Sequence, residues 1–445
     1  MSDNRSTWTS RLGFILASAG AAIGLGAIWK FPYLAGSNGG SVFMFPYIVL
    51  SFTIGLVLLI AEVGLGRTGK GCIVTAYRCI AGRGWTIWGY LGVLTGFMVL
   101  CFYSSIGGWT LSYLIDALMG KGLVNNEKEL GALFGGLVSS PAKSLGFQAL
   151  FLFLTGWVVA KEVSRGIEML SKVLMPLFFV LVLVVIVRGV TLPGASEGLS
   201  YLFAWNPQAF SFESLLSAMG FTFFSLCIGC GCMLTYGSYL SRETNLLSGC
   251  AWITFLTTAA SILGGLMIMP AVFAFNLNPS AGPGLTFMTM PVVFAQLPFG
   301  QLFAAAFYAC LAMAAITSSV SLLELVVAFL VDELKMRRMT ASIVSCVAML
   351  VVGSLCTLSF GPLADYKPLF NRTFFDLFDF FTSNLSLPIG GLVVCALVGW
   401  KRWGMMKEEI RLGSNASEAT MSLFRGVLTI ACPLLVVVVL ISGLI

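Results

Sequence analysis

The 445-residue sequence contains no histidine, and only 10% of its residues are charged, against about 25% in soluble domains. Without histidine it lacks the commonest proton carrier near neutral pH and the commonest metal ligand, so any proton coupling would have to use carboxylates. We also expect no cleavable signal peptide, because the tail before the first apolar segment is short, polar and lacks a small-residue cleavage site. Hydrophobic residues instead make up 58% of the chain, which indicates a polytopic membrane protein rather than a soluble one.

The net charge of +6 is not a nucleic-acid signal, because the basic residues lie at loop ends, where they orient a membrane protein. The twelve cysteines mostly fall inside apolar segments, where free cysteine behaves as a small buried hydrophobe, and they predict no disulfide framework. Cys227, Cys230 and Cys232 form a cluster of the kind that a soft metal favours. No further ligand residue completes a set, so we interpret the cluster as packing.

Eleven apolar segments are long enough to cross a bilayer, which takes about 20 residues per helix. We expect them at residues 12–35, 42–68, 88–118, 145–160, 167–190, 212–238, 245–275, 301–331, 340–359, 374–400 and 422–445. Of the 25 Lys and Arg residues, 18 fall in the N-terminal tail and in every second loop after it. Basic residues gather on the cytoplasmic side, so we expect a protein of the plasma (inner) membrane with a cytoplasmic N-terminus and its C-terminus outside.

Spans 1–5 and 6–10 would form two halves of opposite orientation, because five is an odd number. The predicted fold class is therefore an all-α integral membrane protein with an inverted five-helix repeat (5+5) and an eleventh helix. Residues 1–190 would form the N-terminal half, 191–400 the C-terminal half with its external loops, and 401–445 a cytoplasmic linker with span 11. Gly- and Pro-rich loops would form an external cap at 119–144, 191–211, 276–300 and 360–373.

Glycine interrupts two of these segments at their centres. Span 1 reads Gly20-Ala21-Ala22-Ile23-Gly24-Leu25-Gly26, and span 6 reads Ser225-Leu226-Cys227-Ile228-Gly229-Cys230-Gly231. Glycine costs about 1 kcal/mol against alanine inside a helix, and irregular backbone at membrane depth is tolerated only where it lines a cavity or is buried in protein. Two broken segments at matching places in two halves predict a transporter with its binding site between them.

Motifs of one transporter family recur in order along spans 1 to 10. They are Trp8, Arg11-Leu12-Gly13, Gly24-Leu25-Gly26, Trp29-Lys30-Phe31-Pro32-Tyr33, Asn38-Gly39-Gly40, Phe45-Pro46-Tyr47, Glu62, Gly66-Arg67, Tyr103, Trp109, Thr235-Tyr236-Gly237-Ser238-Tyr239, Thr317-Ser318-Ser319, Asp332-Glu333-Leu334 and Phe375-Asp376-Leu377-Phe378-Asp379. With these motifs the chain resembles the neurotransmitter:sodium symporter family, in its bacterial eleven-span type. The resemblance implies an inverted-repeat fold with broken helices 1 and 6, alternating access, and sodium-driven transport of amino acids or related amines.

The break in span 1 suits an anion, because a half-helix N-terminus offers free N–H groups and positive partial charge near Leu25 and Gly26. The resemblance implies that these amides and the Tyr103 hydroxyl hold a substrate carboxylate; alternatively, Tyr103 is an interface anchor or a packing residue. Carbonyls of the broken helices would meet the substrate's amino end. The complete predicted substrate site is Ala21, Leu25, Gly26, Val99, Tyr103, Phe224, Ser225, Cys227, Cys230, Ser318, Ser321 and Leu322, of which Val99 and Leu322 also fit a plain apolar core.

The resemblance also implies one intact sodium site. Its ligands would be the carbonyls of Gly20, Ile23 and Ala314 with the hydroxyls of Thr317 and Ser318, five hard oxygen atoms that suit an alkali cation. The alternative is that the two hydroxyls merely hydrogen-bond to the backbone of their own helix.

A second sodium site of the family is altered in this chain. Asparagine is replaced by Ala27 and, in our alignment, by Leu256, and a threonine ligand becomes Ser225. Neither Ala nor Leu offers a side-chain oxygen, although Thr257 or Thr258 would supply a hydroxyl if the alignment shifts by one residue. We therefore expect one sodium ion, Na+, per transport cycle. A substrate with an extra positive group, or a differently shaped acid such as a sulfonate, would exploit the missing ion.

Chloride dependence is not expected. The family's chloride site uses a glutamine and a serine at positions that we align with Phe221 and Ala260, which leaves only Tyr47 and Ser225 as polar groups.

Glu62 lies in the middle of span 2, where an ionised carboxylate needs a partner or a proton. The resemblance implies that it supports the break in span 6, and the alternative is a proton carrier. Glu324 on span 8 raises the same question.

Charged and aromatic residues flank the predicted site on both sides. Lys30 and Asp379 would gate the outer side, with Phe224 and Tyr103 as the lid beneath them. Arg5 and Asp332 would close the cytoplasmic side, with Trp8 and Tyr239 packed there, unless these charges are simply solvated loop residues.

Together these features predict sodium-coupled import of a small amino acid or amino-acid-like zwitterion. The alternatives are a proton-coupled amino-acid or amine transporter using Glu62 or Glu324, and a membrane sensor that binds the ligand without turnover. An enzyme is not expected, because no nucleophile–base set is visible. The expected partners are the substrate, sodium and the lipid bilayer, with no nucleic acid, and the oligomeric state stays open.

Overall fold

The structure is a computed structural model that describes residues 7–123, 127–279, 285–414 and 416–443. No β-strand occurs in these ranges. Ten helices in them are long and apolar enough to cross a membrane: Arg11–Ser37, Ser41–Gly69, Arg83–Leu118, Pro141–Ala160, Ser164–Val190, Leu246–Ala274, Gly300–Leu334, Arg338–Leu358, Phe374–Lys401 and Glu418–Ser442. The chain is therefore a multi-pass membrane protein.

The predicted sixth span is the one missing from that set, because it is divided into two short helices. They are α11 (Phe212–Ser225) and α12 (Cys232–Gly237). Between them, Gly229 and Gly231 have φ angles of 93° and 90°, which L-residues with a side chain rarely adopt. With this broken span included, the eleven predicted segments all correspond to helical structure.

Span 1 is broken in the same manner. Helix α1 (Arg11–Leu25) contains Gly24 at φ 36°, and a π-helical turn at Gly26–Lys30 leads into α2 (Phe31–Ser37). The remaining spans are α3 (Ser41–Leu50) with α4 (Leu56–Gly69), α6 (Thr86–Leu118), α8 (Pro141–Ala160), α9 (Met169–Val190), α13 (Leu246–Ala274), α15 (Gly300–Leu334), α16 (Arg338–Leu358), α17 (Phe374–Asp379) with α18 (Leu387–Val394), and α20 (Glu418–Gly426) with α21 (Cys432–Ser442).

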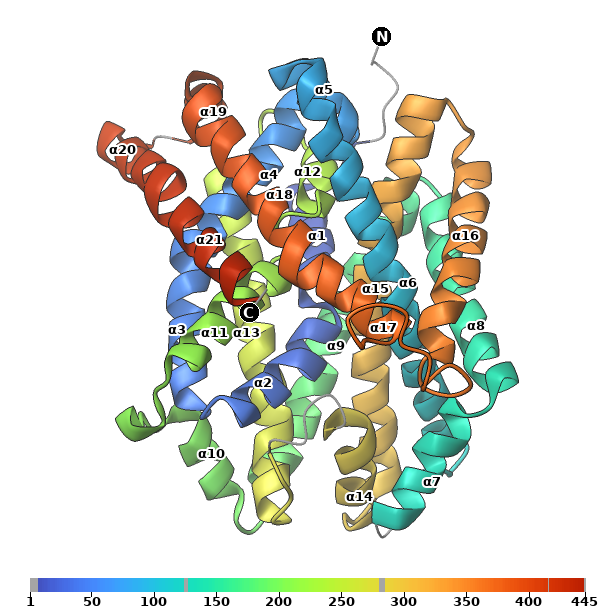
Figure 1. Cartoon of the computed structure of the whole chain (residues 1–445). Helices are drawn as coiled ribbons and strands as arrows, with labels where there is room; N and C mark the ends of the chain where they lie inside the picture. The colour runs from blue at the N-terminus through green and yellow to red at the C-terminus, as the bar shows by residue number, and fades with distance from the viewer. Residues whose placement is uncertain (1–6, 124–126, 280–284, 415, 444–445) are drawn as a thin grey trace.

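Figure 1 shows the two ends of the helix bundle. Helices α5 (Ile73–Ala81) and α19 (Trp403–Arg411) lie at one end, and α7 (Glu127–Val138), α10 (Ala195–Phe203) and α14 (Met290–Ala295) lie at the other. These last three helices fall within the loops predicted to form an external cap. Helices α8 and α16 run side by side along one flank of the bundle, and α20 and α21 lie on the opposite flank.

Glycine lets the broken spans pack closely against their neighbours. A Cβ on Gly66 of α4 would lie 1.8 Å from the carbonyl oxygen of Leu234, so α4 supports the inner half of span 6 directly. A Cβ on Gly264 of α13 would lie 2.2 Å from the carbonyl oxygen of Ala27, next to the break in span 1. Small residues of this kind are typical of helix contacts inside membranes, where packing replaces the hydrophobic driving force.

Candidate substrate and sodium site

A small cavity of about 40 Å³ lies where the two broken spans meet. It is lined by Ala21, Ala22, Gly24, Leu25, Gly26, Val99, Tyr103, Phe224, Cys227, Cys230, Ser318, Leu322 and Leu387. Ten of these residues belong to the substrate site predicted from the sequence. Ala22, Gly24 and Leu387 are additional, and Leu387 comes from span 10, which carried no sequence signal for the pocket.

Two predicted substrate residues do not line this cavity. The Ser321 hydroxyl is buried and donates to the carbonyl oxygen of Ser318 at 2.8 Å, within its own helix. The Ser225 hydroxyl is buried on the last turn of α11, where it donates to the carbonyl oxygen of Thr222 and accepts from Tyr47. Both hydroxyls therefore hydrogen-bond to backbone carbonyl oxygens near the cavity and do not form part of its wall.

The proposed carboxylate end of the site is built from the break in span 1. The freed amide of Leu25 donates to the hydroxyl oxygen of Tyr103 at 3.0 Å, and Tyr103 is only 5% exposed. A Cβ on Gly24 would lie 2.4 Å from the Ser318 hydroxyl, so this turn requires glycine both for its φ angle and for its contact. A donor amide and a hydroxyl that can reorient suit an anionic oxygen.

The proposed amino end is centred on the carbonyl oxygen of Ala21. The Ser318 hydroxyl donates to it at 2.6 Å, and the Cys227 thiol donates to it at 3.4 Å. Cys227 has a φ angle of 52°, so this cysteine belongs to the irregular backbone of span 6. The thiol of Cys230 does not reach Ala21; it donates to the carbonyl oxygen of Cys227 at 3.5 Å.

The predicted sodium ligands divide between α1 and α15. Ser318 donates to the carbonyl oxygen of Gly20 at 3.2 Å, and a Cβ on Gly20 would lie 3.2 Å from the Cβ of Thr317. Thr317 also donates to the carbonyl oxygens of Met313 and Ala314 in its own helix, at 3.0 and 3.1 Å. Hydroxyl and carbonyl oxygens from two facing helices fit a hard alkali cation as co-substrate.

The region of the altered second sodium site requires one correction. The hydroxyl of Tyr47 lies 3.1 Å from that of Ser261, so Ser261 rather than the aligned Ala260 meets Tyr47. This contact supports the alternative alignment along α13, shifted by one residue, in which Thr257 rather than Leu256 would occupy the asparagine position. Leu256 is only half-buried, whereas Thr257 is fully buried, and its hydroxyl has no hydrogen-bond partner among the described residues.

Glu62 supports the break in span 6. Its Oε1 accepts a hydrogen bond of 2.5 Å from the amide of Gly229, and the side chain is 1% exposed. Its second oxygen, Oε2, has no hydrogen-bond partner within the described part of the chain. A carboxylate from α4 thus satisfies a backbone donor that the break leaves unpaired.

Aromatic residues pack together at the predicted cytoplasmic side of the site. The indole nitrogen of Trp8 donates to the carbonyl oxygen of Tyr236 at 2.9 Å, and the rings of Trp8 and Tyr239 pack edge-on with centroids 6.2 Å apart. The Tyr239 hydroxyl donates to Glu324 at 2.6 Å, and Glu324 forms an ion pair with Arg338. Asp332 accepts from the amide of Cys72 at 2.6 Å. Arg5, the predicted partner of Asp332, lies outside the described residues.

The outer side differs from the predicted pair. Lys30 and Asp379 form no salt bridge with each other, although both lie in the part of the chain that the structure describes. The Lys30 ammonium instead lies 4.1 Å from the centroid of the Phe224 ring, and Asp379 accepts from Ser383 at 2.8 Å. Cation–π attraction to the lid residue therefore replaces the expected ion pair. A larger cavity of about 400 Å³, lined in part by Lys30, Phe224 and Asn384, lies here.

Two buried carboxylate clusters near the inner end were missed in the sequence. Glu168, at the start of span 5, accepts hydrogen bonds from the amide and hydroxyl of Thr9 and from the hydroxyl of Ser10, and it pairs with Lys172. It fixes the segment that precedes α1. Nothing in one sequence pairs Glu168 with residues that precede it by more than 150 positions.

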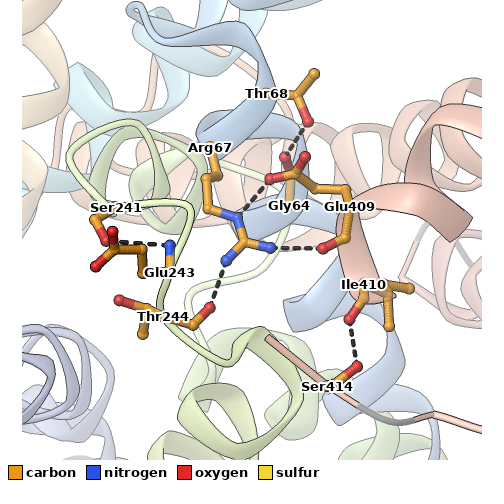
Figure 2. A network of polar contacts seen from close by, with 9 residues as sticks. All are labelled: Gly64, Arg67, Thr68, Ser241, Glu243, Thr244, Glu409, Ile410 and Ser414. Carbon is orange, nitrogen blue, oxygen red and sulfur yellow. Dashed lines mark hydrogen bonds and ion pairs between the residues drawn. The ribbon is translucent and has the colours of Figure 1, made fainter. Parts of the chain in front are cut away.

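The second missed cluster joins span 2 to the linker helix α19 (Figure 2). Arg67 is fully buried; its Nε lies 2.5 Å from Glu409 Oε1, and its terminal nitrogens donate to the carbonyl oxygens of Thr244 and Glu409 at 2.6 Å. The linker predicted to be cytoplasmic is thus held against α4 and against the loop that follows α12.

Comparison with known proteins identifies the family. A family model described as the Sodium:neurotransmitter symporter family matches residues 5–123 and 143–445. The chain belongs to this family.

Relatives of this symporter include the uncharacterized sodium-dependent transporter YhdH of Bacillus subtilis (strain 168). It is 39% identical over 437 residues, which cover 98% of this chain and 97% of YhdH. The human sodium- and chloride-dependent GABA transporter 2 is 28% identical over 379 residues, covering 74% of this chain and 62% of that protein. The crystal structure of MhsT in complex with L-phenylalanine matches with a TM-score of 0.92 and 36% identity over 99% of this chain and 100% of MhsT.

These comparisons confirm the predicted family and the all-α membrane fold. They also establish that the symporter is a membrane transporter that works with sodium. The substrate, the number of sodium ions and the roles of individual residues are the subject of the proposals below.

Proposed function

We propose that this symporter imports a small amino acid, or a zwitterion of similar size, together with one sodium ion by alternating access. The observation that carries the proposal is the cavity between the broken spans, where an amide donor at Leu25 faces a carbonyl acceptor at Ala21. A donor for a carboxylate and an acceptor for an amine within one cavity match the two ends of a zwitterion. The amino-acid-bound structure of MhsT supports the same substrate class.

The volume and lining of the cavity support a small substrate with an apolar or weakly polar side chain. Val99, Leu322 and Phe224 supply apolar walls, and Cys227 and Cys230 add only polarizable thiols. No charged side chain lines the cavity among the residues that the structure describes. A substrate with a second full charge would therefore lack a partner here, which favours neutral side chains.

One sodium ion is proposed because the two candidate sites differ in their oxygen content. Gly20, Thr317 and Ser318 offer carbonyl and hydroxyl oxygens on facing helices, whereas Ala27 offers no side-chain oxygen at the second site. Chloride independence is proposed because the Phe221 ring packs 4.9 Å from the Tyr47 ring, and the nearby hydroxyls of Tyr47, Ser225 and Ser261 hydrogen-bond with one another. Hydroxyls that satisfy one another need no anion.

The proposed orientation has the N-terminus in the cytoplasm and the C-terminus outside the plasma membrane. The basic residues that support it include Arg78, Arg337 and Lys401 at the end of the bundle that carries α5 and α19. Residues 1–190, 191–400 and 401–445 remain the proposed division into two halves and a linker with span 11.

Proton coupling through Glu324 is the less favoured mechanism. Glu324 is buried in an ion pair with Arg338 and accepts a hydrogen bond from Tyr239, and both contacts favour a fixed carboxylate at the proposed inner gate. Glu62 is the remaining candidate, since one of its oxygens is without a hydrogen-bond partner among the described residues.

Uptake by the purified protein in proteoliposomes tests the proposal. Radiolabelled amino acids, amino sulfonates and amines would be offered with an inward gradient of sodium, potassium or choline. The proposal expects uptake of at least one neutral amino acid that requires sodium and persists when gluconate replaces chloride. Uptake that is indifferent to sodium but driven by an inward proton gradient would reject sodium coupling.

A further inference from the structure

Helices α8 and α16 pack side by side on one flank of the bundle (Figure 1). Residues of both helices line an apolar groove of about 480 Å³, and none of the residues of the broken spans lines it. Its lining includes small residues, with Ala149, Gly156 and Ala160 on α8 and Ser342 and Cys346 on α16. Gly156 is needed for the approach of the two helices, because a Cβ there would lie 2.7 Å from the sulfur of Cys346.

Large apolar side chains form the rims of this groove. Phe153 and Trp157 of α8 are each 60% exposed, and Ile343 and Val347 of α16 are 56% and 55% exposed. Both helices are membrane spans, so the groove opens toward the lipid hydrocarbon. A groove of this volume with apolar rims suits a single acyl chain.

One end of the groove is basic. Lys161 lines it and is exposed, with its ammonium 5.3 Å from the centroid of the Trp157 ring. Arg165 and Arg337 are exposed at the same end, where Glu162 is the one exposed carboxylate of the 161–165 turn. Arg338 does not add to this basic end, because its donors are already used. Its Nε donates to the carbonyl oxygens of Val159 and Lys161, and its terminal nitrogens pair with Glu324.

A buried hydroxyl near that end also lacks a partner. Ser342 lines the groove one turn after the start of α16, it is 1% exposed, and its hydroxyl makes no hydrogen bond to any described residue. An unpaired hydroxyl in an apolar setting costs free energy unless a ligand supplies a polar atom. The ester carbonyls of a phospholipid lie between its acyl chains and its headgroup, and Ser342 lines the same groove as the basic Lys161.

We propose that this groove is a binding site for a phospholipid with an anionic headgroup. One acyl chain lies between α8 and α16, an ester carbonyl accepts from Ser342, and the phosphate is held near Lys161 and Arg337. In the proposed orientation the lipid belongs to the cytoplasmic leaflet. Attraction between Lys or Arg and anionic lipid is the general basis for recognition of this kind.

A second copy of the chain is the less suitable occupant. A two-fold contact through the same groove would bring the basic ends of two protomers together in one leaflet, because both protomers share one membrane orientation. Repulsion between Lys161 and Arg337 of each copy would oppose that contact, whereas an anionic headgroup is attracted by the same charges.

Native mass spectrometry of the full-length protein in detergent tests the site with two probes, dioleoylphosphatidylglycerol and dioleoylphosphatidylcholine, at equal concentration. We expect preferential retention of phosphatidylglycerol. Lys161→Gln should lower its apparent affinity about five-fold, the effect of one basic residue near an anionic lipid surface. Arg83→Gln, which removes an exposed basic residue outside the groove, is the control and should leave retention unchanged.

A second pair of variants tests the acyl-chain channel. Ala149→Phe fills the groove away from the Arg338 contacts and should reduce retention of phosphatidylglycerol, whereas Val344→Phe, on an exposed position of α16 outside the groove, should not. Equal retention of both lipids, or wild-type retention by Lys161→Gln, would overturn the proposal. So would a change from dimer to monomer mass in Ala149→Phe, because it would identify a second copy as the occupant. If Ala149→Phe fails to fold, the retention of phosphatidylglycerol by Lys161→Gln and by its control Arg83→Gln still tests the proposal.

Discussion

The amide nitrogen of Leu25 lies 3.0 Å from the hydroxyl oxygen of Tyr103, at the point where span 1 loses its helical hydrogen bonds. This contact joins two groups that can both face a carboxylate: an amide that the helix no longer uses, and a hydroxyl that can donate once it rotates. It is therefore the contact on which the proposed carboxylate end of the substrate site depends most directly.

Tyr103→Phe is expected to weaken amino-acid binding by about 10- to 100-fold. A hydrogen bond to a charged group contributes about 1.5–3 kcal/mol, and phenylalanine keeps the ring while removing the donor. Equilibrium binding of a radiolabelled substrate in detergent would measure the change. Tyr113→Phe is the matched control, because Tyr113 lies on the same helix, is 4% exposed and does not line the cavity. Equal losses in the two variants would remove Tyr103 from the substrate site.

Thr317→Val is expected to raise the sodium concentration needed for half-maximal uptake by about tenfold, since one oxygen ligand worth about 1.4 kcal/mol is lost. Valine has nearly the same shape, so packing against Gly20 is retained. Ser319→Ala is the control: its hydroxyl donates to the carbonyl oxygen of Ile316 and contacts Thr155, on a different face of α15. Unchanged sodium dependence in Thr317→Val would show that Thr317 only hydrogen-bonds within its own helix.

Glu62→Gln and Glu62→Ala are expected to behave differently. Glutamine keeps an oxygen that can accept from the Gly229 amide, so sodium-driven uptake should be largely retained. Alanine leaves that buried amide unpaired, at a cost of about 1–3 kcal/mol, and should lower both the melting temperature and uptake. Loss of coupled uptake in Glu62→Gln with an unchanged melting temperature would instead identify Glu62 as a proton carrier.

The buried pair in Figure 2 predicts a large effect on stability. Arg67→Met should destabilise the protein by about 3–5 kcal/mol, because Glu409 would be left as an unpaired buried charge. Arg67→Met combined with Glu409→Met should recover part of that loss. The exposed pair of Arg411 and Glu418 is the comparison, and Arg411→Gln should change stability by less than about 1 kcal/mol. Thermal unfolding followed by tryptophan fluorescence would measure each variant, and additive losses in the double variant would contradict the pairing.

The fold was predictable because a membrane-spanning helix requires a long apolar segment, which can be recognised in the sequence. Apolar segments mark the spans, and the glycines at Gly24, Gly229 and Gly231 mark the breaks, since each has a φ angle that other residues rarely adopt. The break in span 6 was predicted at Ser225–Gly231, and the structure confirms it, with α11 ending at Ser225 and α12 beginning at Cys232. The sequence did not reveal the close contact of Gly66 with the carbonyl oxygen of Leu234, which packs α4 against α12.

Side-chain pairing was much less predictable. The positions carried over from the family include most of the residues that line the cavity. The Lys30 contact was not predicted: its ammonium lies against the Phe224 ring, where cation–π attraction acts, and forms no ion pair with Asp379. The contact between Tyr47 and Ser261 supports an alignment along α13 that is shifted by one residue. A shift of one residue rotates a helix face by about 100°; the serine next to Ala260 in the sequence was the signal for the shift, but only the contact with Tyr47 supports it.

The proposal of one sodium ion rests on Ala27, which offers no side-chain oxygen, whereas the Thr257 hydroxyl is the group that could oppose it. One charge crossing a potential of 100 mV gains about 2.3 kcal/mol, and a tenfold sodium gradient adds about 1.4 kcal/mol. Their sum of about 3.7 kcal/mol limits accumulation of a zwitterion to about 500-fold, and two ions would allow about the square of that ratio.

Wild-type uptake in proteoliposomes is therefore expected to show a sodium Hill coefficient near one and an accumulation limit near the one-ion value. Thr257→Val provides the discriminating variant, because the buried Thr257 hydroxyl is the group best able to replace the missing asparagine oxygen. With a single ion, this variant keeps the wild-type Hill coefficient. A wild-type coefficient clearly above one that falls to one in Thr257→Val would establish a second sodium site built on that hydroxyl, and the one-ion proposal would be rejected.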